Sequence, residues 1–385
     1  RRVDPLMAEV QDTALGEIAT LTWRGEVPQP DQIYRLVGVR WWGGGAYEYK
    51  RIQGADTQAP QLFRVEPGDL VINKIWARHG SIAIVDETLA GAHGSAEFPT
   101  FTLDTNRVDP RFVHWFSKAK LAWAQCEALS QGTSGKNRVK PERFLTIRIP
   151  LPSLEVQRKL TARFDSASAA VLARENQAAQ VASEVEATLR AAFARIIADA
   201  PRVAMGEIAP LVRRPVVIDP DASYPELGVR SFGKGTFHKP ALPGIEVGTK
   251  KLFPVGAGDL VFNIVFAWEG AVAVAADKDA GRVGSHRFLT CVPDPSRATS
   301  EFLRFWFLSE EGMLALGQAS PGGAGRNRTL GIKALEAIKV QGPSLDAQLW
   351  FDSLQSKARA AKAAQAEATA HLDQLLPAML NEVFG

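Results

Sequence analysis

Two short loops of this chain combine arginine, aromatic residues and glycine in a pattern that suits contact with DNA bases. Trp41-Trp42-Gly43-Gly44-Gly45 follows Arg40, and Ser231-Phe232-Gly233-Lys234-Gly235 follows Arg230. Glycine lets a backbone approach a ligand closely. Arginine can donate two hydrogen bonds to guanine, and apolar groups can contact the methyl group of thymine. The loops are therefore candidates for base contacts, with half-buried loop anchors as the alternative interpretation of the tryptophans.

Further basic and polar residues complete the candidate interface. Lys136-Asn137-Arg138 and Arg326-Asn327-Arg328 suit phosphate contacts, although solvated turns before the next strand would have the same composition. The residues predicted to bind DNA are Arg40, Trp41, Trp42, Lys74, Arg78, Lys136, Asn137, Arg138, Arg230, Phe232, Lys234, Asn263, Arg287, Arg326, Asn327 and Arg328.

The search for cofactor and metal motifs yields no site. Residues 132–137 resemble a phosphate-binding loop, but the spacing is wrong and Asn137 stands where magnesium needs Ser or Thr. The six histidines lack partners at zinc-ligand spacing. We therefore expect no metal and no cofactor bound by this chain.

One enzymatic alternative is a nuclease. Asp31, Glu48 and Lys50 could place two carboxylates and a lysine around magnesium. The second copy of the repeat described below carries His238 and Pro240 in place of Glu48 and Lys50, whereas the Pro-Asp pair is retained. This difference favours a turn common to both copies over a catalytic site.

Length and composition define the class of protein. The chain has 385 residues, enough for two or three domains, and its 46% apolar and 23% charged residues are typical of a globular protein. Two cysteines exclude a disulfide framework, and no apolar run approaches the roughly 18 residues of a membrane span. No apolar stretch follows Arg1-Arg2 as in a signal peptide, and the start on Arg indicates that a few native residues are missing. We expect a cytoplasmic protein.

The strongest signal in the sequence is an internal repeat. Gly68-Asp69-Leu70-Val71 returns 190 positions later as Gly258-Asp259-Leu260-Val261, and Gly38-Val39-Arg40 returns as Gly228-Val229-Arg230. After one residue of slippage, Pro152-Ser153-Leu154 with Gln157 matches Pro343-Ser344-Leu345 with Gln348. A single register across the chain predicts a tandem duplication of a unit of about 190 residues.

Each unit has a globular part followed by a helical part. Strand-like runs such as 70–72 and 81–85 lie between turn residues, and the spacing of aromatic residues predicts a helix over 111–129. Formal charges of +2 over 1–152 and +3 over 200–342 are compatible with a nucleic-acid partner without demonstrating one. The predicted fold class is α+β: two globular domains, 1–152 and 200–342, and two long helical segments that separate and follow them, 153–199 and 343–385, which we call the spacer segments.

The spacer segments carry apolar residues at alternating steps of four and three, which is the signature of a coiled coil. Ordinary amphipathic helices are the alternative. The predicted seam includes Leu160, Phe164, Arg174, Val185, Leu354, Gln365 and Leu372. In an antiparallel pair the polar Arg174 and Gln365 would meet near the middle and set the register, or Arg174 could extend to solvent.

The order and duplication of these motifs resemble the specificity subunit of type I restriction-modification systems. The resemblance lies in the two closing phrases, Pro152-Ser153-Leu154 with Gln157 and Pro343-Ser344-Leu345 with Gln348, each before a long helix, and in the repeated Gly-Asp-Leu-Val. It covers the whole chain. Val156 and Ala347 precede the glutamines where the family more often has Glu, a departure that leaves the architecture intact.

The resemblance implies a chain without catalysis that reads a bipartite double-stranded DNA site. Residues 1–152 and 200–342 would be its two target-recognition domains, and 153–199 and 343–385 would be antiparallel spacer helices. It also implies two methyltransferase subunits, on which S-adenosylmethionine would bind, and restriction subunits in a larger complex. The alternatives are a nuclease or methyltransferase component that uses Asp31, Glu48 and Lys50, and a coiled-coil interaction protein without a DNA role. The target bases and the spacing between half-sites do not follow from the sequence.

Overall fold

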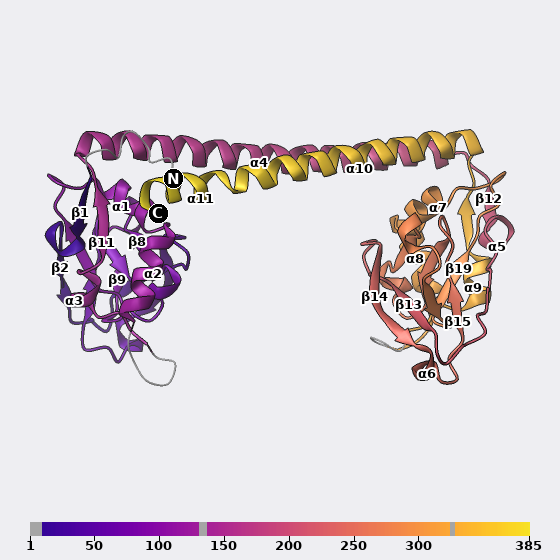
Figure 1. The fold of residues 1–385 in the computed structure, drawn as a ribbon, viewed down its shortest axis with the longest axis horizontal. Coiled ribbons are helices and arrows are strands. Elements are labelled where there is room, and N and C mark those ends of the chain that lie inside the picture. The colour runs from indigo at the N-terminus through magenta and orange to yellow at the C-terminus, as the bar shows by residue number, and fades with distance from the viewer. Residues whose placement is uncertain (1–9, 131–136, 324–327) are drawn as a thin grey trace. The chain divides into compact units, whose positions relative to one another are not determined.

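Turn-bounded apolar runs become short strands, and the long Ala-rich segments become helices, in both halves of the chain. The computed structural model describes residues 10–130, 137–323 and 328–385. It contains two units, residues 1–179 with 365–385 (unit 1) and residues 180–364 (unit 2), each with its own core. Each unit combines a small α+β domain with portions of two long helices, as coloured along the chain in Figure 1. The predicted fold class is confirmed.

Unit 1 contains two mainly antiparallel sheets and a separate pair of antiparallel strands. Their orders are β2-β10-β7-β8, β3-β6-β9-β4-β5 and β1-β11, with β4 and β9 parallel. The strands are β1 (Gln11–Ala14), β2 (Ala19–Thr22), β3 (Gly25–Glu26), β4 (Ile33–Val39), β5 (Ala46–Gln53), β6 (Leu62–Arg64), β7 (Leu70–Ile72), β8 (Ile82–Ile84), β9 (His93–Gly94), β10 (Thr100–Leu103) and β11 (Arg148–Leu151).

Unit 2 repeats this arrangement with one strand fewer in each of its two larger sheets. Its sheets have the orders β17-β16-β19, β14-β13-β18-β15 and β12-β20, with β13 and β18 parallel. The register shift between Leu36 and Val37 in β4 recurs between Pro225 and Leu227 in β13. The strands are β12 (Arg202–Ala204), β13 (Ser223–Val229), β14 (Thr236–Pro243), β15 (Leu252–Pro254), β16 (Leu260–Asn263), β17 (Val272–Val274), β18 (Val283–Ser285), β19 (Phe288–Cys291) and β20 (Lys339–Gln341).

Each unit also contains several short helices. The single helix predicted over 111–129 is in fact two, α1 (Pro110–Phe116) and α2 (Lys120–Leu129). The chain leaves the first helix at Ser117, whose hydroxyl donates to the carbonyl of His114 at 2.7 Å and competes with helical hydrogen bonding. The others are α3 (Pro141–Phe144), α5 (Met205–Ile208), α6 (Gly244–Val247), α7 (Ser300–Phe307), α8 (Glu310–Gln318) and α9 (Ile332–Ala337).

The two spacer segments form long helices. The first, α4 (Leu154–Ile197), contains no glycine or proline, which favours an uninterrupted helix. The second divides into α10 (Leu345–Asp373) and α11 (Leu375–Phe384). Pro377 has no N–H to donate to the carbonyl four residues earlier, at Asp373, and this accounts for the break.

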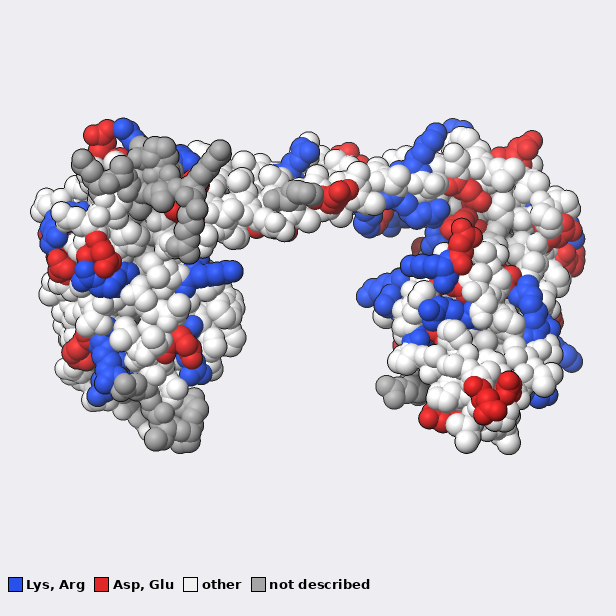
Figure 2. All heavy atoms as spheres, viewed as in Figure 1, with Lys and Arg blue, Asp and Glu red and all other residues white. Residues whose placement is uncertain are grey.

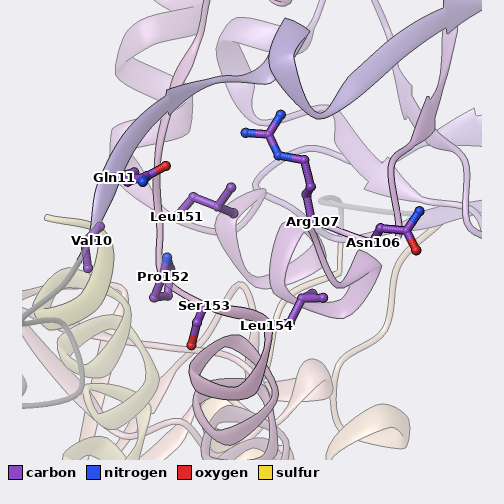
Figure 3. A pocket seen from close by; sticks show the side chains of 8 residues that line it. All are labelled: Val10, Gln11, Asn106, Arg107, Leu151, Pro152, Ser153 and Leu154. Carbon is purple, nitrogen blue, oxygen red and sulfur yellow. The ribbon is translucent and has the colours of Figure 1, made fainter.

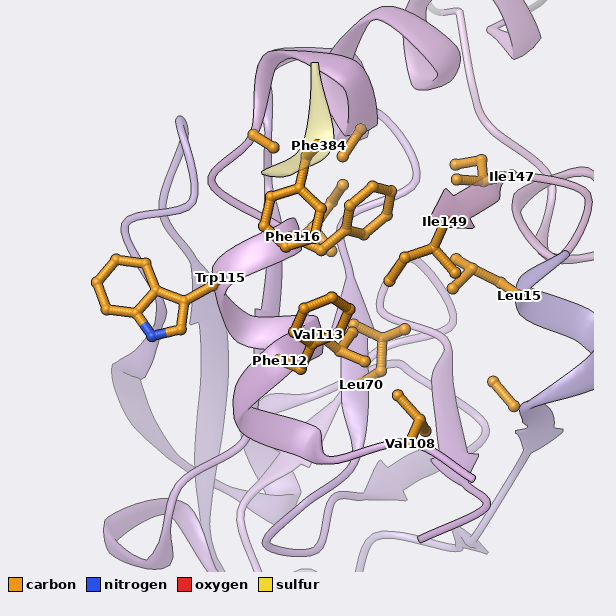
Figure 4. Packing of buried hydrophobic residues seen from close by; sticks show 14 of the residues in the cluster. Leu15, Leu70, Val108, Phe112, Val113, Trp115, Phe116, Ile147, Ile149 and Phe384 are labelled. Atoms are coloured by element: carbon orange, nitrogen blue, oxygen red, sulfur yellow. The ribbon is translucent and has the colours of Figure 1, made fainter. Parts of the chain in front are cut away.

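Aromatic residues join the helices to the domain cores. In unit 1 the ring of Phe384 from α11 lies 5.1 Å from Phe112 of α1 and 6.1 Å from Phe164 of α4, as part of the cluster in Figure 4. In unit 2 Phe193 of α4 lies 5.7 Å from Phe302 of α7 and 5.5 Å from Phe351 of α10. The start of each long helix therefore packs against the end of the other, so the two helices run antiparallel.

The predicted seam agrees with the burial of most of its members, with one exception. Leu160 and Phe164 are buried, and Val185, Leu354, Gln365 and Leu372 are partly buried. Arg174 is exposed, and its guanidinium donates to Gln177 on the same helix at 3.0 Å, so its placement on the seam was wrong. The partly buried positions beyond Arg174 include Ala178, Ala182, Val185, Leu189 and Ala192, which keep the alternating steps of four and three. The predicted positions Val181 and Thr188 are exposed, so the buried face lies one residue further along at every second seam position.

The repeated Gly-Asp-Leu-Val motif has a structural role. Asp69, 3% exposed, receives two hydrogen bonds from Arg24 at 2.6 and 3.1 Å. Asp259 and Arg214 repeat this pair at 2.6 and 3.2 Å. The motif therefore combines a tight turn, a paired buried carboxylate and the first residues of β7 or β16.

No helix within the described ranges is long and apolar enough to cross a membrane.

Candidate nucleic-acid interface

The loop after β4 is held by main-chain hydrogen bonds to the turn after the short 3-10 helix η4 (Ala77–His79). The N–H of Trp42 donates to the carbonyl of His79 at 2.7 Å, and the N–H of Gly43 donates to Gly80 at 2.8 Å. The N–H of Arg40 closes the loop on the carbonyl of Gly45 at 2.9 Å. We call residues 40–45 clamp loop 1, because these three bonds fix its backbone.

Clamp loop 2, residues 230–235, has the same backbone. Phe232 donates to Glu269 at 2.7 Å, and Gly233 donates to Gly270 at 2.9 Å. Trp42 has φ +58° and Phe232 has φ +61°, and across the described residues they are the only non-glycine positions with positive φ. A left-handed conformation costs an ordinary L-residue about 1–2 kcal/mol, so both copies keep the same strained position.

The side chains on the two clamp loops differ. In unit 1, Trp41 and Trp42 are 49% and 54% exposed. Trp41 lies 5.1 Å from the ring of Trp76, and Trp42 lies 5.2 Å from Trp123. The ring of His79 is within 5.6 Å of both loop tryptophans. The predicted tryptophans thus belong to a half-exposed aromatic cluster, which combines the two interpretations given by the sequence.

Clamp loop 2 presents one aromatic residue among polar ones. Phe232 is 71% exposed, and the ammonium of Lys234 lies 5.8 Å from its ring centre. Ser231 donates its hydroxyl to the carboxylate of Glu269 at 3.0 Å. The two loops therefore have the same backbone hydrogen bonds and present different side chains: indole rings in tilted and edge-on contacts in unit 1, and a phenyl ring with hydrogen-bonding groups in unit 2.

The two loop arginines lie on neighbouring aromatic rings. The guanidinium carbon of Arg40 is 4.2 Å from the ring centre of Tyr47, and that of Arg230 is 5.0 Å from Phe237. Arg230 also donates to the carbonyl of Thr236 at 3.3 Å. Both arginines are exposed, so the rings support guanidinium groups whose outer edges remain open to a ligand.

The remaining unit 1 candidates flank this cluster. The guanidinium of Arg78 donates to the ring of His79 at 3.2 Å and lies 6.0 Å from the ring centre of Trp76. Lys74 and Arg138 both face Glu97, at 4.0 and 3.2 Å. These pairs reduce the positive charge that the two residues would offer to phosphate. Asn137 is partly buried.

In unit 2 two candidates have structural roles. The side-chain carbonyl of Asn263 accepts the N–H of Val265 at 3.1 Å. Arg328 donates to the carbonyls of Ser320 and Gly317, at 3.1 and 2.8 Å, and lies 5.0 Å from the ring of Trp268. The fold therefore already uses both side chains. Asn263 closes an Asx turn, and Arg328 donates to carbonyls at and just beyond the end of α8, which lack helical partners.

Arg287 is exposed, and its main-chain N–H donates to the hydroxyl of Ser285 at 3.3 Å. Lys136, Arg326 and Asn327 lie outside the described residues.

The nuclease alternative receives no support from the geometry of its residues. Glu48 accepts hydrogen bonds from Arg51 at 2.7 Å and from Arg35 at 2.8 Å, which lowers the pKa of its carboxyl to about 2. Asp31 is exposed, and Lys50 lies over the ring of Tyr49. In the described part of the chain no three potential metal-ligating side chains come together. Glu48 serves here as an ion-pair partner.

The glutamines of the closing phrases fasten each long helix to its domain, a role that the sequence did not predict. Gln157 donates to the carbonyls of Arg107 and Pro152, at 3.0 and 2.8 Å, and accepts the N–H of Asp109 at 2.9 Å. Gln348 repeats these three bonds in unit 2, at 3.0, 2.9 and 3.0 Å. Both glutamines are fully buried. Figure 3 shows the hollow beside the first anchor, where Arg107 and Leu154 lie.

Comparison with known proteins shows the fold. No protein-family model and no curated protein sequence matches the chain. Among solved structures, an HsdS subunit from Thermoanaerobacter tengcongensis has 21% identity and a TM-score of 0.62, covering 100% of this chain and 98% of that one. A chain from a structure of type I R-M system assembly has 19% identity and a TM-score of 0.69, covering 100% and 99%. The chain therefore has the fold of these subunits over its full length.

Proposed function

We propose that this chain is the specificity subunit of a type I restriction-modification complex. Each domain reads one half of a bipartite DNA site, and the chain itself carries out no catalysis. The observation that carries the proposal is the pair of clamp loops, whose backbone bonds are the same in both units and whose exposed side chains differ. A protein that reads two different half-sites needs a common frame with different contact residues.

The two domains together supply the specificity that one alone lacks. Each correct base pair contributes roughly 1–3 kcal/mol, so a single domain that reads a few base pairs would bind many sites in a genome. Two domains in one chain add their contributions and fix the gap between half-sites, as two-fold dimers do on palindromes. Fusing unlike copies permits an asymmetric target.

The long helices act as the spacer and as the surface for two methyltransferase subunits. Gln157 and Gln348 support this proposal because each fixes the first turn of its helix to the adjacent domain. A rigid joint is required if helix length is to determine the gap between half-sites. The methyltransferase subunits bind S-adenosylmethionine and transfer its methyl group to adenine, and restriction subunits join the larger complex.

The test is expression of the chain with its methyltransferase subunits in a host that lacks adenine methylation. Sequencing of methylated adenines is expected to show one motif made of two specific parts and a fixed gap. Replacing residues 1–152 with another recognition domain should change one half and leave the other half and the gap unchanged. The matched experiment replaces residues 200–342 and should change the other half.

Two outcomes would contradict the proposal. The first is the absence of any sequence-specific methylation from a complex that assembles. The second is a change in both half-sites after replacement of one domain. Methylation by the chain without its partners would instead support the methyltransferase alternative.

A further inference from the structure

We propose that Phe232, and Trp42 in unit 1, are wedges that enter the DNA base stack when the neighbouring adenine leaves it. This inference rests on the proposed function and concerns a step that base contacts alone do not explain. Enzymes that modify a base must take it out of the duplex, at a cost of a few kcal/mol. Apolar side chains inserted between base steps lower this cost because they replace the lost stacking.

The first support is the backbone at the two positions. Both aromatic residues have the positive φ that glycine adopts freely and a bulky residue adopts at a cost. The next residue in each loop is a glycine, so a glycine one position earlier would lower the strain without altering the fold. Two copies that differ at most surface positions nevertheless both place an aromatic side chain there.

The second support is the exposure of the phenyl ring. Phe232 is 71% exposed, although its backbone N–H and that of Gly233 are fixed to the turn at Glu269 and Gly270. An apolar ring stabilises the fold mainly through its burial, so an exposed ring contributes little to stability. The same rigidity favours insertion, since the ring enters the stack with little loss of conformational freedom.

The third support is the charge around the rings. The ammonium of Lys234 lies near the ring of Phe232. The guanidinium of Arg230 lies over the ring of Phe237, two residues after the end of clamp loop 2. In Figure 2 basic side chains gather along the edge of unit 2 that carries β14. The acidic neighbour is Glu269, whose carboxylate accepts the hydroxyl of Ser231 at 3.0 Å. An aromatic ring flanked by cations matches duplex DNA, in which phosphates border the stacked bases.

In unit 1 the wedge has a firmer base. The ring of Trp42 is backed by Trp123 at 5.2 Å and His79 at 5.6 Å. The ammonium of Lys118 donates to the carbonyl of Gly43 at 2.9 Å, which places a cation at the root of the loop. Leu308 occupies the equivalent position in unit 2. Unit 2 therefore gives the cleaner test, because Phe232 can be changed without disturbing an aromatic cluster.

The central experiment compares Phe232→Gly with the wild-type chain, each assembled with methyltransferase subunits. The probe is a plasmid that carries the site found by methylation sequencing of the wild type. We expect the methylation rate in the half-site read by unit 2 to fall about tenfold or more. The other half-site should change less than twofold. Permanganate reactivity of the thymine opposite the target adenine, which reports unstacking, should fall in parallel.

Three further variants separate the wedge from a structural role. Phe232→Gly should melt at the same temperature as the wild type or higher, because glycine removes the strain. Phe232→Trp should retain methylation, because Trp42 is the natural counterpart. Val217→Ala removes a 93% exposed apolar side chain of the same unit and should leave methylation unchanged.

A mismatched probe provides the decisive comparison. A mismatch at the target adenine weakens stacking and pairing in advance, so Phe232→Gly should regain most of its methylation rate on that duplex. Equal deficits on matched and mismatched duplexes would overturn the wedge and assign Phe232 to ground-state binding. Wild-type methylation with an unaffected Phe232→Gly variant would also overturn it, and the proposed function would stand. No specific methylation by the wild type would refute the proposed function itself.

Discussion

The carboxylate of Asp69 faces the guanidinium of Arg24 across two hydrogen bonds, at 2.6 and 3.1 Å, and Asp259 faces Arg214 in the same way. A second carboxylate contact strengthens the arrangement, because Asp69 also accepts the N–H of Glu66 at 2.9 Å. The aspartates are almost completely buried, whereas the arginines are partly exposed. Each pair thus joins the segment that carries the arginine to the turn before β7 in unit 1 or β16 in unit 2.

Removal of the arginine should destabilise one unit. Arg24→Ala leaves the Asp69 carboxylate buried without its cation, and we expect a loss of about 3 kcal/mol in the free energy of unfolding. Urea unfolding followed by intrinsic fluorescence measures the loss. Arg40→Ala, at an exposed site in the same unit, should change the free energy by less than about 0.5 kcal/mol. Equal stability of both variants would show that the pair contributes little.

The glutamine anchors give a second prediction. Gln157→Leu removes one accepted and two donated hydrogen bonds, and it leaves the partly buried Asp109 without its main-chain N–H partner. We expect the free energy of unfolding to fall by about 3 kcal/mol and the Asp109 amide to exchange faster with solvent. Hydrogen exchange followed by mass spectrometry measures both effects. Gln177→Leu on the exposed face of α4 is the matched control, and the same exchange rates in both variants would contradict the anchor.

The sequence predicts the architecture well because the architecture is duplicated. The matches at Gly68-Asp69 and Gly258-Asp259 indicate a repeated turn and strand from residue types and spacing alone, and the strands over residues 70–72 and 82–84 confirm it. The long helices also follow directly from composition, because α4 extends over 44 residues without glycine or proline. Local propensity and a hydrophobic pattern suffice for these features.

The interface is harder to predict, since its geometry depends on contacts between residues far apart in the sequence. Arg328 had the composition of a phosphate contact, yet carbonyls at the end of α8 occupy its guanidinium. The left-handed backbone of Trp42 depends on a turn almost forty residues later. One signal was available: the glycine after Trp42 and after Phe232 stands at the same place in both copies. A repeated aromatic-glycine pair is typical of a constrained turn.

The loop arginines should contribute to specificity more than to general affinity. Arg230→Ala is expected to weaken binding of the assembled complex to its own site about tenfold or more, and to random duplex about twofold. Competition binding at two salt concentrations separates the effects, because phosphate contacts alter the salt dependence. Lys251→Ala, an exposed basic residue of the same unit, is the control. Equal losses on both DNAs would make Arg230 a phosphate contact.

The position of Arg174 leads to a prediction opposite to the one from the heptad pattern. Its side chain is exposed and bonded to Gln177 on the same helix, so Arg174→Leu should change the free energy of unfolding by less than about 0.5 kcal/mol. The gap between methylated half-sites should stay the same. Val185→Asp, at a partly buried seam position, should lower stability by about 1–3 kcal/mol. A changed gap in Arg174→Leu would restore the register role.

His114 should make the stability of unit 1 depend on pH. Burial lowers its pKa from 6.5 to about 4, and the nearby cations Lys118 and Arg111 act in the same direction against Asp165. The folded state therefore disfavours the proton that the unfolded chain accepts near pH 6.5. The stabilisation is complete above that pH and is lost progressively as the pH falls toward 4. Between about pH 7 and pH 5 we expect a loss of roughly 1–2 kcal/mol. His114→Gln should flatten this part of the profile, as measured by thermal melting at a series of pH values. Substitution of the exposed His286 should leave the profile unchanged, and an identical slope in wild type and His114→Gln would assign the pH dependence to other groups.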